Sequence, residues 1–420
     1  MRMNKKKEIV PKLRFPEFGT SEGWKKYKLR ELADRITKKV GDNKLVTLSI
    51  SAGIGFVSQA EKFSRDISGK QYCNYIYLKK GEFSYNKGNS KTFPQGCIYE
   101  LKEYEEAAVP NAFISFRFKE NLVPSFYQGY FDSNFHGKQL IRFITSGARC
   151  DGLLNISPTD FFSIVLPTPV KKEEQQKIAD CLSSIDELID AESRKLKALE
   201  KYKKGLMQKL FPAEGKTMPE WRSPEFRGCG EWKYEEIGNI GEVITGKTPS
   251  TSDAALWDGD IQFVTPTDIT ENKYQHHTQR TVVKTPKMKV LPKHTIMFTC
   301  IASIGKMALS LYPCISNQQI NSIVPKSCYN NEFIYYSLLQ KTFLIKAGFA
   351  NSTLPIINKT DFSKIQVPVI LDKKEQQKIA ECLSEVDTMV EEQSNKVEQL
   401  KKHKKGLMQG LFPSLEEADV

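Results

Sequence analysis

The chain has 420 residues, of which 40% are hydrophobic and 27% charged, and its 62 Lys and Arg residues outnumber its 50 Asp and Glu residues to give a net charge of +12. This composition is typical of a globular protein with two or more domains, and no apolar run approaches the 18 residues of a membrane-spanning helix. No apolar stretch follows the basic N-terminal residues as in a secretory signal, and the nine cysteines form no CxxC pair, so we expect free thiols in the cytoplasm. The excess of positive charge favours a nucleic acid or another anionic partner.

A first globular unit is predicted over residues 13–170, after a flexible basic leader over residues 1–12. Short runs of β-branched and aromatic residues, KLVTLSI, NYIYL and NAFISFRF, are separated by glycine-rich turns, which is typical of strands. A helical stretch is expected over residues 124–143. The motif Leu166-Pro167 then ends the last strand, because proline interrupts regular structure. The unit is therefore predicted to be a strand-rich α+β module.

A long helix is predicted over residues 171–212, where the first proline comes at the last position. Apolar residues recur at alternating spacings of four and three, and Glu192 and Lys203 fill the two gaps in the pattern. This period of 3.5 residues over four to five heptads is typical of a coiled-coil seam about 60 Å long. The predicted seam residues are Ile178, Leu182, Ile185, Ile189, Leu196, Leu199 and Leu206.

The second globular unit is predicted over residues 213–371, with a linker at 213–218. Its opening segment, WRSPEFRGCGEWKY, matches that of the first unit at a constant offset of 208, and its closing segment, AGFANSTLPIINKTDFSKIQVPVIL, aligns with the first unit's SGARCDGLLNISPTDFFSIVLPTPV. The middles do not match, although GDIQFVTP, HTIMFTC, MALSLY and INSIVP again read as strands and residues 331–347 as a helix. We therefore expect two unlike α+β modules that share only their ends.

A second long helix is predicted over residues 372–413, before a tail at 414–420. It repeats the first helix without a gap at an offset of 201, with 24 of 41 positions identical. Repeated segments indicate a repeated architecture, although an ordinary amphipathic surface helix used twice is the alternative. The matching seam residues are Ile379, Leu383, Val386, Val390, Val397, Leu400 and Leu407.

The two helices are predicted to pair in antiparallel orientation. A parallel pair would place Lys203 against Lys404, whereas an antiparallel pair whose facing numbers sum to 589 places Lys203 by Val386 and Lys404 by Ile185. Each lysine stem can then lie along apolar surface. The expected fold class is α+β, with two strand-rich modules joined by two long antiparallel coiled-coil helices in a pseudo-twofold arrangement.

No catalytic or metal-binding constellation is found. GEVITGKT at 241–248 fits the phosphate-loop string GxxxxGK[ST], but Pro249 and a polar stretch follow where that motif requires a helix. His276-His277 lacks partners at metal-ligand spacing. The group Asp268, Glu271 and Lys273 loosely resembles a nuclease cluster, but its spacing is tight and chance explains it better.

Several polar loops suit contact with nucleic acid, because Asn and Gln can bond adenine edges and Lys or Arg can bond guanine or phosphate. Solvated turns are the alternative for any single loop. The candidate DNA-binding residues are Tyr85, Asn86, Lys87, Asn89, Lys91, Arg149, Lys247, Thr248, Thr267, Ser303, Lys306, Asn317, Gln318 and Asn351.

The strings EQQKIA…CLS and KKGLMQ, each present twice, together with ITGKTPS, GDIQFVTPTDI and SIGKMALS…SNQQI, resemble the specificity subunits of type I restriction–modification systems over nearly the whole chain. The stretch YNKGNSK resembles a recognition domain of another subtype in that family. The resemblance implies a non-catalytic cytoplasmic subunit with two target-recognition domains, each reading one half of a bipartite, asymmetric site in double-stranded DNA.

The resemblance also implies that the helices set the spacer between the half-sites and dock two adenine-methylase subunits. Two restriction subunits would complete the complex, and S-adenosylmethionine, ATP and Mg²⁺ would belong to these partners. A non-catalytic coiled-coil scaffold that binds only proteins is the main alternative, and a stand-alone enzyme acting on DNA is a second.

Overall fold

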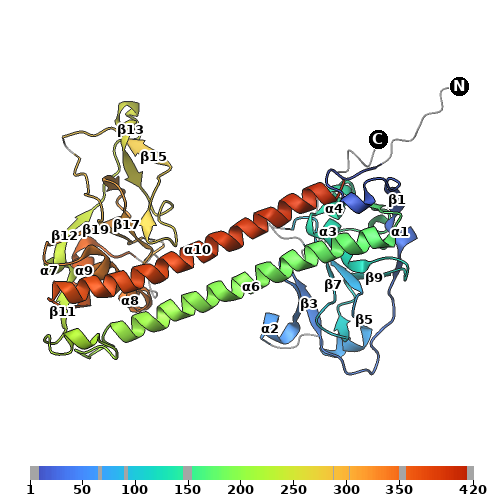
Figure 1. Ribbon diagram of the computed structural model, residues 1–420, viewed down its shortest axis with the longest axis horizontal. Helices are drawn as coiled ribbons and strands as arrows, with labels where there is room; N and C mark the ends of the chain where they lie inside the picture. Colours follow the sequence, from blue (N-terminus) through green and yellow to red (C-terminus); the bar gives the residue numbers. More distant parts are fainter. Residues whose placement is uncertain are drawn as a thin grey trace. The chain divides into compact units, whose positions relative to one another are not determined.

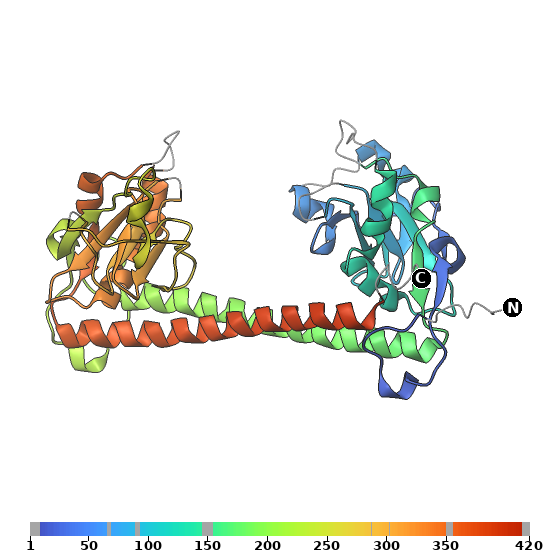
Figure 2. The ribbon, with the colours of Figure 1, turned by 90° about the horizontal axis from the view of Figure 1, so that it is seen from above.

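The computed structural model describes residues 9–64, 69–88, 93–144, 154–286, 288–301, 303–349 and 356–413. The chain divides into two compact units, unit 1 (Met1–Ala191 with Glu398–Val420) and unit 2 (Glu192–Val397). Each unit combines one globular module with part of each long helix (Figures 1 and 2). Among the described residues, no helix is both long and apolar enough to cross a membrane.

The two long helices are α6 (Lys172–Leu210) and α10 (Lys373–Leu411), which begin and end within two residues of the predicted bounds. Within each unit they run side by side in opposite directions (Figure 1). In unit 1, Lys404 Nζ lies 2.7 Å from Asp186 Oδ1, and in unit 2 Lys203 pairs with Asp387. Each lysine thus pairs with the aspartate next to its predicted seam neighbour, Ile185 or Val386, and the antiparallel orientation is confirmed.

The polar seam residues meet differently from the prediction. Glu192 was expected to face Val397, and Gln393 to face Leu196. Instead, Gln393 Nε2 donates a hydrogen bond of 2.7 Å to Glu192 Oε2, because two polar groups on facing helices satisfy each other better than either satisfies an apolar neighbour.

Seam burial is strongest toward the N-terminal half of each helix. The buried seam residues are Ile178, Leu182, Ile185, Ile189, Ile379, Leu383, Val386 and Val397. The remaining predicted ones, Leu196, Leu199, Leu206, Val390, Leu400 and Leu407, are half-buried. The first buried residues of α6 also pack on the module of unit 1, because Ile178 and Leu182 belong to its aromatic core.

The module of unit 1 is built around a four-stranded antiparallel sheet in the order β2-β9-β6-β7. The module also contains three two-stranded sheets, β3-β4, β5-β8 and β1-β10. The strands are β1 (Lys25–Lys28), β2 (Ala33–Arg35), β3 (Leu48–Ser51), β4 (Gly55–Ser58), β5 (Ile76–Lys79), β6 (Phe83–Asn86), β7 (Cys97–Glu100), β8 (Glu106–Val109), β9 (Ile114–Phe118) and β10 (Val165–Thr168). The helices are α1 (Leu29–Leu32), α2 (Gln59–Phe63), α3 (Pro124–Asp132), α4 (Phe135–Leu140) and α5 (Pro158–Phe161).

The module of unit 2 is built around a five-stranded sheet in the order β12-β19-β16-β17-β14. A three-stranded sheet, β15-β13-β18, and the pair β11-β20 accompany it. The strands are β11 (Lys233–Glu236), β12 (Gly241–Thr245), β13 (Trp257–Val264), β14 (Tyr274–Gln275), β15 (Arg280–Val282), β16 (Ile296–Thr299), β17 (Met307–Ser310), β18 (Cys314–Ser316), β19 (Ile320–Pro325) and β20 (Gln366–Val369). The helices are α7 (Ile237–Ile240), α8 (Asn331–Phe349) and α9 (Lys359–Ser363).

The two modules share a core that their sequences do not reveal. The strands β2-β9-β6-β7 and β12-β19-β16-β17 have the same order, and every neighbouring pair is antiparallel in both. The segment that joins β6 to β7 is therefore the topological counterpart of the segment that joins β16 to β17.

Each opening segment holds the start of a long helix through a buried ion pair. Arg14 Nε and Nη2 donate to the two carboxylate oxygens of Glu174 at 2.7 and 2.8 Å, and Arg222 does the same to Glu375 at 2.7 and 2.7 Å. Trp24 Nε1 adds a third hydrogen bond to Glu174, at 3.0 Å. These bidentate pairs explain why both copies of the helix carry a glutamate before the QQ pair.

The end of each helix closes a module core. Phe412, after α10, has its ring centroid 4.5 Å from that of Tyr130 in unit 1, and Phe211, after α6, lies 5.6 Å from Phe333 in unit 2. Phe211 is fully buried and Phe412 nearly so. The repeated LFP motif therefore anchors the C-terminal half of each helix to a module.

The predicted leader over residues 1–12 is too long. Ile9 is buried, and its carbonyl accepts a hydrogen bond of 2.7 Å from Trp24 N. In unit 2, Thr217 accepts the equivalent bond from Trp232 N at 3.0 Å, so the linker packs in the same way. Residues 1–8 and the predicted tail at 414–420 lie outside the described residues.

Candidate nucleic-acid interface

Four loops of unit 2 meet at one end of its five-stranded sheet. Strands β12 and β16 end there, while β17 and β19 begin there. Backbone hydrogen bonds tie the loops together, from Lys247 N to Ser316 O at 2.8 Å and from Cys300 N to Gln319 O at 2.8 Å. The turn after β13 joins them through Asn317 N, which donates to Val264 O at 3.0 Å.

This end of the sheet brings together five of the predicted side chains. Lys247, Lys306, Thr267 and Gln318 are exposed, and Thr248 Oγ1 donates to Gln318 Oε1 at 2.6 Å. The surface thus combines two ammonium groups with hydroxyl and amide groups. Such a mixture can bond both phosphates and base edges.

Asn317 has a supporting role rather than the predicted contact role. Its side chain is buried, and its Oδ1 accepts from Gln319 N at 3.1 Å while its Nδ2 donates to Gln319 Oε1 at 3.0 Å. Both ends of the amide therefore shape the turn. Ser303 is half-buried, and its carbonyl accepts from the fully buried Thr299 hydroxyl, which holds the loop at its base.

The stretch at residues 241–248 is not a phosphate loop. Its first part is strand β12, and the next helical turn is the three-residue 3₁₀ segment Ala254–Leu256. A Cβ atom on Gly246 would lie 2.1 Å from the Asn317 carbonyl oxygen, so this glycine permits the close approach of two loops.

The carboxylate of Asp268 caps a turn through three hydrogen bonds. Oδ2 accepts from Thr265 N at 2.8 Å and from Thr265 Oγ1 at 2.6 Å, and Oδ1 accepts from Gln279 N at 2.9 Å. This geometry agrees with chance as the reason for the nuclease-like spacing. Within the part of the chain that the structure describes, no group of His, Cys, Asp or Glu could hold a metal ion, and His276 and His277 are exposed.

At the corresponding end of unit 1, the structure describes residues 87–88 after β6 and residues 93–96 before β7. Asn86 Oδ1 accepts from Gly88 N at 2.9 Å, and the carbonyl of the half-buried Lys87 accepts from Leu154 N at 2.9 Å. In unit 2, Cys300 O accepts from Ile357 N at 2.9 Å, so the same closing segment supports the same loop in both units. The candidate residues Asn89, Lys91, Arg149 and Asn351 lie outside the described residues.

Tyr85 is a core residue, which corrects its prediction as a DNA contact. Its side chain is fully buried, its ring stacks on Phe161 at 4.7 Å, and its hydroxyl donates to the Gln95 carbonyl at 2.7 Å. Strand alternation is the signal that could have shown this, because Tyr85 shares a face with the buried Phe83.

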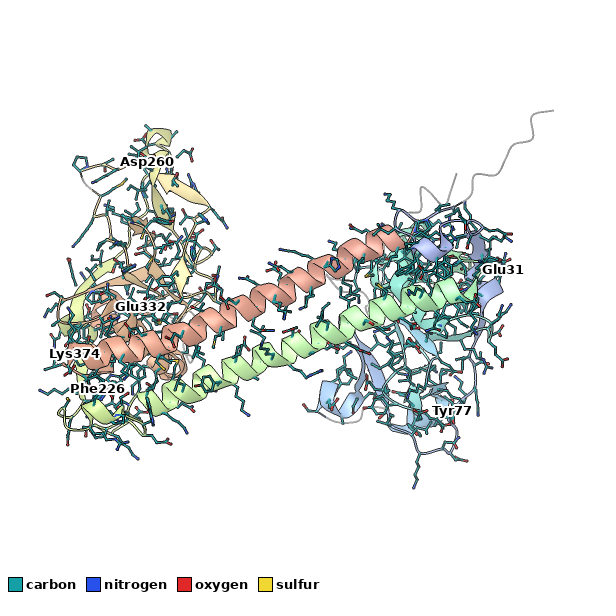
Figure 3. All side chains as sticks on the ribbon, viewed as in Figure 1. Glu31, Tyr77, Phe226, Asp260, Glu332 and Lys374 are labelled. Atoms are coloured by element: carbon teal, nitrogen blue, oxygen red, sulfur yellow. The ribbon has the colours of Figure 1, made fainter. Side chains whose placement is uncertain are left out.

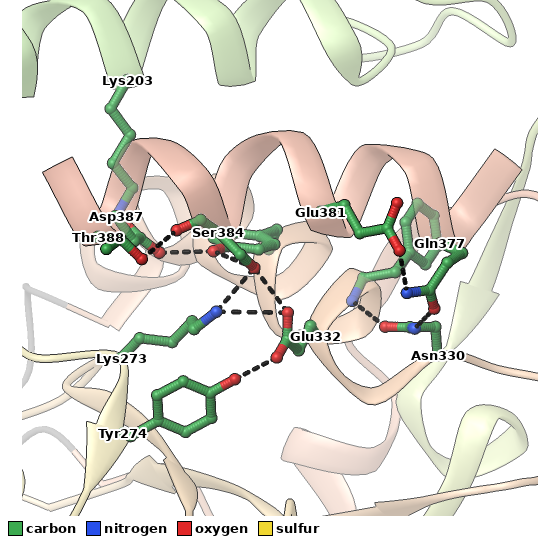
Figure 4. A network of polar contacts seen from close by, with 12 residues as sticks. Lys203, Lys273, Tyr274, Asn330, Glu332, Gln377, Glu381, Ser384, Asp387 and Thr388 are labelled. Carbon is green, nitrogen blue, oxygen red and sulfur yellow. Dashed lines mark hydrogen bonds and ion pairs between the residues drawn. The ribbon is translucent and has the colours of Figure 1, made fainter.

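The end of the five-stranded sheet opposite the candidate interface is connected to α10 by a polar network. Glu332 of α8, labelled in Figure 3, accepts from Tyr274 Oη and, at 2.6 Å, from Ser384 Oγ of α10, and Lys273 Nζ lies 3.3 Å away (Figure 4). Burial alone would raise the pKa of Glu332, but these hydrogen bonds and the ammonium group lower it below its ordinary value. Further along α10, Asp387 accepts from Tyr336 Oη at 2.5 Å.

The family model for the type I restriction modification DNA specificity domain matches the chain twice, over residues 21–201 and 230–402. The chain belongs to this family. The two matches together take in both modules and most of both long helices.

Among curated specificity-domain proteins, the type I restriction enzyme MjaIX specificity subunit of Methanocaldococcus jannaschii is 33% identical over 180 residues, 41% of each chain. The putative MjaX specificity subunit of the same organism is 27% identical over 69% of this chain and 67% of its own. The HindI specificity subunit of Haemophilus influenzae is 30% identical over 32% of this chain and 31% of its own. The alignments with MjaIX and HindI therefore span less than half of those relatives.

Two solved structures share the fold. The S subunit of the type I restriction-modification system from M. genitalium has a TM-score of 0.63 at 16% identity and covers 97% of this chain and 100% of its own. A chain from a study of complex assembly and conformational transition in the type I R-M system has a TM-score of 0.55 at 15% identity, covering 93% of this chain and 98% of its own. The predicted family and fold class are thus confirmed.

Proposed function

We propose that this chain is the DNA-recognition subunit of a type I restriction–modification complex, and that each module reads one half of a bipartite, asymmetric DNA site. The observation that carries the proposal is the same four-strand core in both modules with different polar residues at the corresponding strand ends, Asn86 and Lys87 in unit 1 and Lys247, Lys306 and Gln318 in unit 2. A shared core gives both modules the same means of presenting loops, and the different loops allow each to read a different sequence. The subunit itself would be non-catalytic and would work in the cytoplasm.

Lys247 and Lys306 suit phosphate oxygens, and Thr267 and Gln318 suit base edges in the major groove. Phosphate contacts release counterions, so the affinity should fall steeply as salt rises. These side chains form one exposed set on unit 2. The protein-only scaffold is not favoured, because it requires no such set.

We also propose that the repeated segments dock two methylase subunits. Several large apolar side chains are exposed at equivalent positions in the two units: Val10 and Met218, Leu13 and Trp221, Val170 and Leu371, and Leu188 and Met389. In unit 2, an apolar cavity of about 80 Å³ lies beside Trp221. The same exposed apolar set in both units suits two copies of one partner, because apolar groups gain stability when a partner covers them. Restriction subunits would join the same complex, and S-adenosylmethionine, ATP and Mg²⁺ would be bound by the partners.

The direct test is to express the chain with its methylase subunit in a host without other adenine methylation and to map methylated adenines by single-molecule sequencing. The expected result is one motif with two fixed halves and an unread spacer. A protein-only scaffold would leave the host genome unmethylated by this complex and would show no DNA affinity.

Lys306→Ala should weaken binding of the complex to its mapped site and reduce the slope of log affinity against log salt by about one, because one phosphate contact is lost. The matched control is Lys326→Ala, since Lys326 is also exposed but lies just beyond the end of β19, at the opposite end of the sheet. Fluorescence anisotropy at several salt concentrations measures both. An equal loss for the two variants would argue against this interface.

A further inference from the structure

Arg280, at the start of β15, is held flat against a tryptophan. Its guanidinium carbon lies 3.4 Å from the centroid of the Trp257 ring. That ring is itself fixed, because Trp257 is buried, its Nε1 donates to Ser250 O at 3.0 Å, and Phe263 packs edge-on against it at 5.2 Å. The guanidinium group is therefore held against the indole ring before any ligand arrives.

Arg280 lies beside the candidate interface of unit 2. It pairs with Phe263 in the ladder between β15 and β13, the strand on which Figure 3 labels Asp260. The preceding residue, Gln279, donates its N–H to Asp268, the cap of the turn that follows β13. This turn is the one that Asn317 joins to the other loops.

The donors of Arg280 are not used within the protein. Its side chain is exposed, and among the described residues none accepts a hydrogen bond or forms an ion pair with its guanidinium group. Arg14 and Arg222 differ from Arg280, because each has a buried side chain whose guanidinium N–H groups pair with a glutamate. Arg280 thus presents guanidinium N–H groups that are held against Trp257 and unpaired, next to the polar loops of the candidate interface.

We propose that Arg280 reads a guanine in the half-site recognised by the second module, by donating two hydrogen bonds to the O6 and N7 atoms. This inference rests on the proposed function. A planar fork matches the two acceptors on the guanine edge, and stacking on Trp257 reduces the freedom that binding would otherwise remove. The flexible Lys247 and Lys306 suit phosphates better, because an ammonium group is a point charge without a fixed plane.

The test compares methylation motifs of complexes that contain the wild-type chain, Arg280→Ala, Arg280→Lys or Arg227→Ala. Arg227 is the matched control, an exposed arginine in the opening segment of the same unit. Both Arg280 variants should lose the preference for one G·C pair in one half-site by about tenfold to a hundredfold, with the other half-site and the spacer unchanged. Arg280→Lys keeps the charge, so it remains informative if Arg280→Ala does not fold.

An unchanged motif in the Arg280→Lys complex would overturn the inference, as would a uniform loss of methylation at all sequences, which indicates a phosphate contact. A wild-type motif of A·T pairs alone would also overturn it. A wild-type complex without any bipartite motif would instead refute the proposed function. The two failures are therefore distinguishable.

Discussion

His136 lies buried beside Gly96, the residue that precedes β7. Its Nε2 is 3.3 Å from the carbonyl oxygen of Gly96. Burial lowers the pKa of His136 to about 4, because the imidazolium ion would lose its water, and the hydrogen bond with Gly96 only partly opposes this effect. The ring is therefore neutral at physiological pH and contacts Gly96 as an uncharged group.

The lowered pKa predicts that acidification destabilises unit 1. In the unfolded chain the pKa of His136 returns to about 6.5, so the unfolded state gains the proton first and stability falls as the pH drops from about 6.5 towards 4. At pH 5, this effect of His136 lowers the free energy of unfolding by about 2 kcal/mol. His136→Gln should lack this part of the pH dependence, as measured by urea unfolding at pH 7 and pH 5. Equal pH dependence in the two proteins would contradict the assignment.

The sequence correctly predicts that several residues of the candidate interface are exposed. Lys247, Lys306 and Gln318 lie in polar loops and are exposed as the sequence suggests. The position of Asn317 depends on the hydrogen bond from its backbone N to the carbonyl of Val264, 53 positions earlier, and no local pattern reveals that contact. Arg280 likewise owes its position to Trp257 on a neighbouring strand, so its role emerges only from the fold.

At the scale of elements, each opening segment is fastened to the helix that follows its module. The carboxylate of Glu375 is almost fully buried, and Arg222 supplies its charge partner through two hydrogen bonds. Arg222 also donates to the carbonyl of Gly230, at 2.8 Å. The ion pair therefore orders the opening segment and the helix start together.

Arg222→Ala should lower the free energy of unfolding by about 3–5 kcal/mol, because it leaves a buried carboxylate without a partner. Adding Glu375→Gln should recover part of this loss by removing the buried charge. Urea unfolding followed by circular dichroism gives both values, with Arg227→Ala as the exposed control. A loss below about 1 kcal/mol for Arg222→Ala would show that the pair is not structurally important.

The long helices were predictable as elements, whereas the architecture of the modules was not. A regular 3.5-residue period defines α6 and α10 to within two residues. The order β2-β9-β6-β7 and its counterpart in unit 2 come from pairings between distant strands whose sequences have diverged. The Asp186 and Asp387 partners of the seam lysines were also missed, because they stand one position beside the apolar seam.

At the scale of the whole molecule, the repeat produces the same connection between an opening segment and the end of a long helix in each unit. In unit 1, Leu13 N donates to Gly410 O at 2.8 Å, which joins the N-terminal segment to the end of the second long helix. In unit 2 the equivalent bond runs from Trp221 N to Lys209 O at 2.9 Å, between neighbouring parts of the sequence. The same contact between opening segment and helix end thus occurs in both units. Such a repeated scaffold suits the proposal that two different DNA-reading modules are attached in the same way.

The most direct test of this scaffold is to insert four residues after Ala191 and four after Val397, where each long helix passes from one unit to the other, and to map the methylated motif again. The insertions add about 6 Å to each helix, so the spacer should grow by one or two base pairs while both half-site sequences stay the same. Four residues added after Pro413 serve as a control and should leave the motif unchanged. An altered half-site, or an unchanged spacer in an active complex, would contradict the proposal that two independent DNA readers are held apart by the paired helices.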